Sequence, residues 1–190
     1  MAMPQIDRME LKIILRELER ALDADGDAVE FGCYRGDTSL ELARAIRNTN
    51  KQLWLYDSFE GLPEKSNVDC SSAGEAFQLG ELKATKVALV NRFRKTNLPL
   101  PSIKKGWFSE LTNQDLPEKI CFAFLDGDFY LSIKDSLRLI QDKLTAGAII
   151  VVDDYQSEAL PGVRQAVNEW LIKNPRRKLR VEKSLAIISI

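Results

Sequence analysis

The chain has 190 residues, of which 45% are hydrophobic and 29% charged, and its formal net charge is −1 at pH 7. This composition is that of a globular protein and excludes a disordered or fibrous chain, and the length suits one domain over residues 1–190. The near-zero charge gives no reason to expect a nucleic acid or an anionic membrane as a partner.

The spacing of the cysteines, the absence of histidine and the lengths of the apolar runs limit the expected cellular location and the possible catalytic groups. The cysteines at positions 33, 70 and 121 are too widely spaced for a zinc site or a disulfide framework, which predicts a reducing compartment. No apolar run approaches the ~18 residues needed to cross a bilayer, and the N-terminus lacks a signal-peptide pattern, so we expect a cytoplasmic protein without a membrane partner. Because histidine is absent, any catalysis must depend on carboxylates, lysines or tyrosines.

The predicted elements alternate along the chain. Asp7 and Glu10 predict a capping box for a helix that reaches about Leu22. Apolar runs predict strands over 28–31, 52–56, 103–108, 121–125 and 148–152. Helical spacing predicts helices over 38–46, 84–95, 132–144 and 161–172. The last two predicted strands, 179–182 and 185–190, are joined by a connection that suits only an antiparallel pair.

Strands that are apolar on both faces and alternate with helices are typical of a parallel sheet covered on each side. We therefore predict a doubly wound α/β fold, with a mostly parallel seven-stranded sheet that ends in an antiparallel C-terminal hairpin. Such sheets bind ligands at the carboxyl ends of their strands.

A glycine turn follows the first predicted strand. Residues 30–39 read EFGCYRGDTS, with Gly32 and Gly36 leading into a helix, which differs from the dinucleotide fingerprint G-x-G-x-x-G. Asp37 stands where a pyrophosphate would bind, so a zwitterionic or cationic ligand with a nucleoside part fits better. A tight turn without a ligand is the alternative.

The second predicted strand ends at Asp57, which could accept hydrogen bonds from both hydroxyls of a ribose. The alternative is that Asp57 only caps the turn that follows.

Acidic pairs follow two further strands: Asp126 and Asp128, then Asp153 and Asp154. Strand ends that lie about 4.8 Å apart can bring three carboxylates around one ion, and such hard oxygen ligands suit Mg²⁺. Two alternatives remain open. The aspartates could cap helices, or they could form salt bridges with Lys104, Lys105 or Arg164.

Six segments, in this order, resemble the macrocin O-methyltransferase family: VEFGCYRGDTS, LYDSFEGLPE, KKGWF, FLDGDFY, GAIIVVDDY and PGVRQAV. The resemblance covers about residues 28–170. It implies a class I, Rossmann-like methyltransferase fold and the transfer of a methyl group from S-adenosylmethionine to a sugar hydroxyl with the help of Mg²⁺.

The resemblance also implies a role for each matching residue. Glu30, Gly32, Arg35 and Gly36 would line the methionine end of the cofactor. Its nucleoside would lie against Asp57, Ser58, Gly106, Trp107 and Phe108, and Asp126 completes the cofactor-binding set. Asp126, Asp153 and Asp154 would ligate Mg²⁺, and Asp126 would be the catalytic residue that accepts the proton of the acceptor hydroxyl.

We therefore expect an S-adenosylmethionine- and Mg²⁺-dependent O-methyltransferase that acts on a small molecule with adjacent hydroxyls. Residues 57–83, which are polar and contain glycine, would form a mobile lid over the site. Two alternatives remain: a non-catalytic cofactor-binding domain, and a metal-dependent sugar-nucleotide transferase. A homodimer is compatible with the sequence, which leaves the oligomeric state open.

Overall fold

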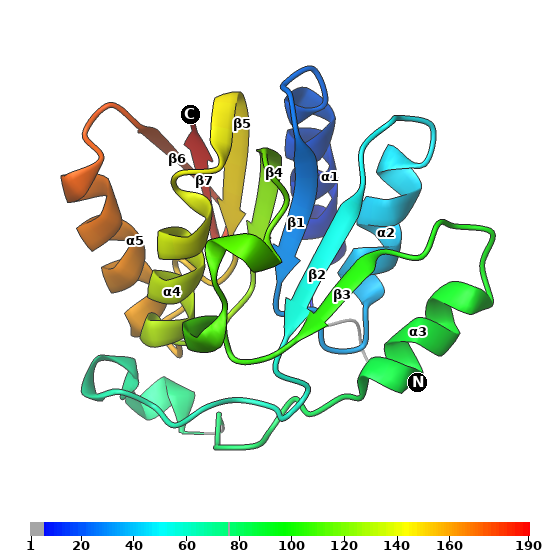
Figure 1. Cartoon of the computed structure of the whole chain (residues 1–190). Coiled ribbons are helices and arrows are strands. Elements are labelled where there is room, and N and C mark those ends of the chain that lie inside the picture. Colours follow the sequence, from blue (N-terminus) through cyan, green and yellow to red (C-terminus); the bar gives the residue numbers. More distant parts are fainter. Residues whose placement is uncertain (1–5, 76) are drawn as a thin grey trace.

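A computed structural model describes residues 6–75 and 77–190, and their strands form one seven-stranded sheet in the order β3-β2-β1-β4-β5-β7-β6 (Figure 1). The strands are β1 (Asp27–Phe31), β2 (Leu53–Asp57), β3 (Ser102–Lys105), β4 (Ile120–Leu125), β5 (Leu144–Val152), β6 (Lys178–Glu182) and β7 (Leu185–Ser189). β1 to β5 pair in parallel, whereas β7 is antiparallel to both β5 and β6. The predicted doubly wound sheet with a C-terminal hairpin is confirmed.

Helices cover both faces of the sheet (Figure 1). They are α1 (Arg8–Ala21), α2 (Asp37–Ile46), α3 (Lys86–Arg94), α4 (Tyr130–Ile140) and α5 (Pro161–Lys173). The first three pack on one face and the last two on the other. None of the helices in the described part of the chain combines the length and apolar content needed to span a membrane.

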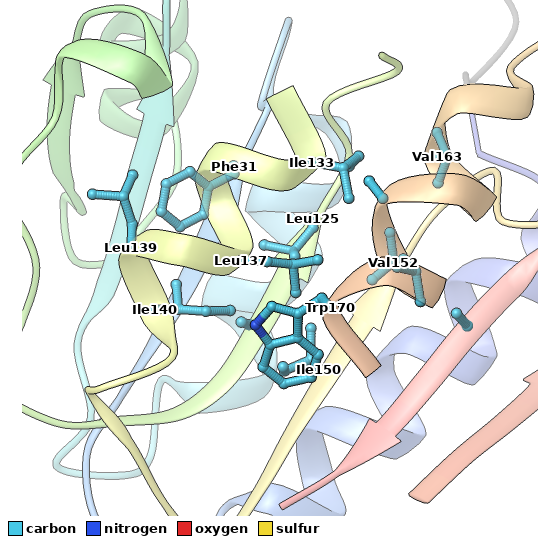
Figure 2. Packing of buried hydrophobic residues seen from close by; sticks show 14 of the residues in the cluster. Phe31, Leu125, Ile133, Leu137, Leu139, Ile140, Ile150, Val152, Val163 and Trp170 are labelled. Atoms are coloured by element: carbon cyan, nitrogen blue, oxygen red, sulfur yellow. The ribbon is translucent and has the colours of Figure 1, made fainter. Parts of the chain in front are cut away.

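The strand residues divide between two apolar clusters. Along β4, Phe122 and Phe124 join the cluster under α1, α2 and α3, while Ala123 and Leu125 join the cluster under α4 and α5. Figure 2 shows this second cluster, in which Trp170 of α5 packs near Ile150. The period of two explains why these strands are apolar at every position.

Three local predictions differ from the structure. The helix expected over 132–144 ends at Ile140, because Leu144 pairs with Ile120 and begins β5. The strand expected over 103–108 ends at Lys105. Asp7 caps α1 through a bond from the Met9 N–H, but Glu10 accepts bonds from Ser184 instead of completing a capping box.

Residues 58–75 and 77–83, which we call the strap, run beneath the carboxyl ends of the strands (Figure 1). The strap contains two 3₁₀ turns, η1 (Asn67–Asp69) and η2 (Ser72–Gly74). Asp69 is fully buried and accepts a 2.7 Å hydrogen bond from the Tyr130 N–H at the start of α4. Its other oxygen accepts bonds from the Ser66 N–H and hydroxyl. The buried Asp69 carboxylate therefore attaches the middle of the strap to the start of α4.

Candidate active site

Two adjoining cavities lie at the carboxyl edge of the sheet. The first, of about 320 Å³, contains all four paired aspartates and is called the aspartate cavity. The second, of about 340 Å³, contains Glu30 and is called the glutamate cavity. Both are lined by Ile6, Gly32, Tyr34 and Asp126. The two cavities therefore meet at the tips of β1 and β4.

The glycine turn lets the backbone of β1 approach that of β4. Gly32 has a φ of 85°, and a Cβ atom on it would lie 1.8 Å from the carbonyl oxygen of Asp126. Gly36 has a φ of 81° at the N-cap of α2, where a Cβ would lie 2.2 Å from Leu89. At Gly32 the Asp126 backbone leaves no room for a Cβ, and the positive φ favours glycine at both places. Gly32 lines both cavities, whereas Gly36 lies outside the two lining sets and shapes the turn.

Glu30 is an almost completely buried acid in the glutamate cavity, with 1% of its surface exposed. The Ser39 hydroxyl donates a 2.5 Å hydrogen bond to it. Burial, with a smaller contribution from the charge of Asp57, raises the pKa of Glu30 to about 8. A buried acid of this kind is suited to a cationic ligand group, which would restore its ionised form.

Arg35 also lines the glutamate cavity, and its guanidinium lies 4.9 Å from the centre of the Tyr34 ring. Asp37, which we expected to affect a ligand in the turn, forms an ion pair with Arg92 at 2.6 Å. Its charge is therefore directed toward α3.

Asp57 organises the glycine turn from the tip of β2. One carboxylate oxygen accepts 2.9 Å bonds from the N–H groups of Cys33 and Tyr34, and the other accepts a 2.7 Å bond from the Phe59 N–H. The turn-capping alternative is thus part of its role. Asp57 also lines the aspartate cavity, and the oxygen that accepts from Phe59 has a second lone pair for a ligand hydroxyl.

Ser58, Trp107 and Phe108 line the same cavity beside Asp57. Phe108 is held by an edge-to-face contact with Phe31, with ring centroids 5.2 Å apart. Gly106 is outside the lining set, and its N–H donates to the Asp57 carbonyl at 3.0 Å. This bond joins the segment that carries Trp107 and Phe108 to the end of β2.

The acidic pairs converge, with one change from the prediction. Ligand oxygens of Asp126, Asp128 and Asp154 lie within 4.8 Å of one another. Asp128 and Asp154 have positive φ angles of 60° and 56°, a conformation that aspartate tolerates better than most residues. Asp153 lines the cavity, but one of its oxygens accepts a bond from the Asp154 N–H. The structure thus places Asp128 beside Asp126 and Asp154, where we expected Asp153.

The charges of this cluster are not balanced by basic side chains within the described residues. The lysines and the arginine that could have formed salt bridges are engaged elsewhere: Lys104 with Asp115, Lys105 with Glu60, and Arg164 with the Tyr155 carbonyl. Burial and mutual repulsion raise the pKa of Asp126 well above its usual range and that of Asp128 to about 8. A half-buried set of three hard oxygen ligands without a counter-charge fits a divalent cation such as Mg²⁺.

These pKa shifts predict a pH-dependent response to metal. Burial raises the pKa of Asp153 to about 7 and that of Asp154 to about 6. At these aspartates the folded protein therefore binds more protons than the unfolded chain between about pH 4 and pH 8, and without metal their contribution to stability falls as the pH rises. Saturating Mg²⁺ should raise the melting temperature by about 5–10 °C at about pH 8, and much less at about pH 5.5. Differential scanning fluorimetry measures this, and an equal shift at both pH values would contradict it.

Several lining residues were missed by the sequence prediction. Tyr34, Gly127 and Ser132 lie beside predicted residues, so their positions in the same motifs could have indicated them. Strap residues Leu62, Pro63, Phe77 and Leu82 form an apolar wall. Glu10 enters the cavity from α1, and no local pattern could have placed it there.

The sheet order, with its antiparallel seventh strand and a crevice at the carboxyl edge, defines the class I, Rossmann-like O-methyltransferase fold. The chain belongs to the macrocin-O-methyltransferase (TylF) family, whose model matches residues 3–185.

One curated relative is the 8-demethyl-8-(2,3-dimethoxy-alpha-L-rhamnosyl)-tetracenomycin-C 4'-O-methyltransferase of Streptomyces olivaceus. It is 28% identical over 154 residues, which are 76% of this chain and 58% of that protein. This chain thus spans somewhat less than two thirds of the length of that relative.

Solved structures show the same fold. The O-methyltransferase NovP has a TM-score of 0.84 and 24% identity, covering 100% of this chain and 82% of NovP. CalS11, described as a TDP-rhamnose 3'-O-methyltransferase, has a TM-score of 0.67 and 18% identity, covering 95% of this chain and 78% of CalS11.

Proposed function

We propose that this protein is an O-methyltransferase that transfers a methyl group from S-adenosylmethionine to a sugar hydroxyl, with Mg²⁺ as a second cofactor. The observation that supports this most strongly is the junction of the two cavities at Asp126. On one side lies a buried acid suited to an ammonium group, and on the other lies a carboxylate cluster suited to a metal.

The cofactor would extend across the junction. Glu30 would pair with the ammonium group of its methionine part, and Arg35 would face the carboxylate. Asp57 would accept a hydrogen bond from a ribose hydroxyl, while Ser58, Trp107 and Phe108 would enclose the adenine. When bound, S-adenosylmethionine supplies the electrophilic methyl group.

Asp126, Asp154 and either Asp128 or Asp153 would hold Mg²⁺. When bound, the ion supplies a positive charge that lowers the pKa of a nearby acceptor hydroxyl. Asp126 would accept the released proton, because it is the one aspartate of the cluster that lines both cavities. The strap would exclude water with its apolar wall of Leu62, Phe77 and Leu82.

A sugar acceptor follows from the relatives. The S. olivaceus enzyme is named for a rhamnosyl group attached to an aglycone, and CalS11 is described by a nucleotide-activated rhamnose. Rhamnose has neighbouring hydroxyls, and in the 2,3-dimethoxy-rhamnosyl group the 4-hydroxyl lies beside a methoxy oxygen, so both sugars offer two adjacent oxygens to a cation at the cluster.

Radiolabelled S-adenosylmethionine provides the test. We expect label transfer to a glycoside or a catechol in the presence of Mg²⁺, and its loss when the metal is chelated. Calorimetry with S-adenosylhomocysteine should show binding with or without Mg²⁺. Cofactor binding without transfer to any acceptor would favour the non-catalytic alternative.

A further inference from the structure

The sheet ends in two edge strands, β3 and β6, which differ in how well they are protected from pairing (Figure 1). Among the described residues, no further strand pairs with the outer side of either one. β3 has four residues, follows Pro99 and Pro101 and ends with two lysines, features that oppose pairing with another strand. β6 contains no proline and carries the apolar residues Leu179 and Val181. It is therefore the edge that is more open to a partner strand.

The backbone of β6 has unpaired polar groups at alternate residues. The Ile190 N–H donates to the Ala148 carbonyl, so the even-numbered residues of β7 direct their backbone groups toward β5. The odd-numbered residues of β7 therefore bond to β6, where their partners are the even-numbered residues. The N–H and C=O groups of Leu179 and Val181 are left facing away from the sheet.

The same two residues present exposed apolar side chains. Leu179 lies opposite Ile188 and Val181 lies opposite Ala186, and both partners belong to the core cluster under α4 and α5. Because directly opposite residues share a face of the sheet, Leu179 and Val181 continue this apolar face to its open edge. Their exposed fractions are 36% and 37%. The edge thus offers backbone hydrogen bonds and an apolar surface together.

A second copy of β6 matches these features in one register. An antiparallel pair centred on Arg180 is the register that pairs all five residues of both strands. It places Leu179 of each copy opposite Val181 of the other, so that their outward N–H and C=O groups can bond to one another. The two apolar side chains then meet on the face of the sheet that carries α4 and α5.

The charged residues of β6 agree with this register. Lys178 lies opposite Glu182 of the second copy, and within the described residues it has no ion pair that would compete. Arg180 lies opposite its own copy, where like charges would repel. Its charge is already offset, because Glu17 and Glu182 of the same chain contact it at 2.7 and 2.6 Å. The strand is therefore complementary to itself in charge as well as in its apolar residues.

We propose that two copies of this chain associate through β6, so that their sheets join into one continuous sheet about a two-fold axis. Because the strands of the two copies run in opposite directions, the two crevices open at opposite edges of the joined sheet and neither blocks the other. The contact also reaches the site. Ser184, in the turn after β6, donates a 2.7 Å hydrogen bond to Glu10 and lies 3.4 Å from Asp153, and both acids line the aspartate cavity.

Sedimentation velocity from about 0.5 to 300 µM tests the association without reference to methyl transfer. A contact between two short strands is small, so we expect a monomer that converts to a dimer with a Kd of about 1–100 µM. Lys178→Glu places like charges opposite each other twice about the axis and should raise this Kd about tenfold or more. Lys95→Glu is the same charge change at an exposed position after α3, and it should leave the Kd unchanged.

Cysteine pairs test the register. In a Cys70→Ser background, which removes the exposed native thiol, Leu179→Cys mixed with Val181→Cys should form a disulfide-linked dimer on mild oxidation. Opposite, hydrogen-bonded residues have Cα atoms about 5.5 Å apart, which a disulfide can bridge. Either variant alone should not cross-link, because its two Cα atoms would lie more than about 7 Å apart.

Three results would overturn the proposal. The first is a monomer throughout the concentration range. The second is a dimer whose Kd does not change in Lys178→Glu, which would place the contact elsewhere on the surface. The third is cross-linking of either cysteine variant alone that equals cross-linking of the mixture. Each of them would leave the proposed function intact.

Discussion

Replacing Asp154 with asparagine should lower Mg²⁺-dependent methyl transfer by about 100-fold or more, because the site loses a charged ligand. Asparagine keeps the size of the side chain and tolerates the positive φ of 56° at this position. The affinity for S-adenosylhomocysteine should change by less than about threefold, since Asp154 is not among the residues that line the glutamate cavity. Initial rates across a Mg²⁺ titration, with calorimetry for the cofactor product, measure both quantities.

Asp142→Asn is the matched control, because this aspartate is exposed in the turn after α4. It should retain full activity. Comparing Asp128→Asn with Asp153→Asn then identifies the third ligand: the variant whose Mg²⁺ affinity falls as far as that of Asp154→Asn carries it. Full activity of Asp154→Asn at low Mg²⁺ would contradict a metal role for this residue.

Replacing Asp69 with alanine should destabilise the protein by about 3 kcal/mol. The change removes a fully buried carboxylate that accepts bonds from Tyr130 and Ser66. It also leaves the first N–H of α4 without its partner. Urea unfolding measures the loss of stability, and limited proteolysis should show faster cutting within residues 66–75. The KM for S-adenosylmethionine should rise, because Leu62 and Phe77 of the strap line the cavity.

Ser71→Ala serves as the comparison for Asp69→Ala. It removes a 3.3 Å hydrogen bond to the Ala159 carbonyl and a 3.0 Å bond from the Gly74 N–H within the same strap, and it should cost about 1–2 kcal/mol. The attachment through Asp69 refines the predicted mobile lid, since motion should be greatest on either side of residues 66–74. If Asp69→Ala unfolds at the same urea concentration as Ser71→Ala, Asp69 is not the main attachment.

Much of the fold could be predicted from the sequence because a strand that is buried on both faces is apolar at every position, and such runs are easily recognised. The strands predicted at 121–125 and 148–152 are apolar throughout, and both end where predicted; the first begins one residue early, at Ile120, and the second begins four residues early, at Leu144. The apolar stripe of Ile133, Leu137 and Ile140 continues to Leu144 and predicts a helix up to that residue. In the structure Leu144 pairs with Ile120 and begins β5 instead. The spacing of apolar residues within one segment cannot reveal a pairing partner 24 residues away.

The candidate site was predictable only as far as strand ends could be located. The four aspartates were expected at one edge of the sheet, and they lie there. Three of them, Asp126, Asp128 and Asp154, converge, and two of these three have positive φ angles. The order of the residues does not specify these backbone angles, so the converging set could not be predicted. Glu10 reaches the cavity because α1 packs against the sheet and Ser184 bonds to it, a contact between residues 174 positions apart.

The central claim is that carboxylates from β4 and β5 bind one divalent cation beside the cofactor. Crystals grown with S-adenosylhomocysteine and Mn²⁺, a stand-in for Mg²⁺ with strong anomalous scattering, test it directly. We expect one anomalous peak about 2.0–2.3 Å from oxygens of Asp126 and Asp154, with S-adenosylhomocysteine in the adjoining cavity. An ordered cofactor product with no peak among these aspartates at saturating Mn²⁺ would contradict the claim.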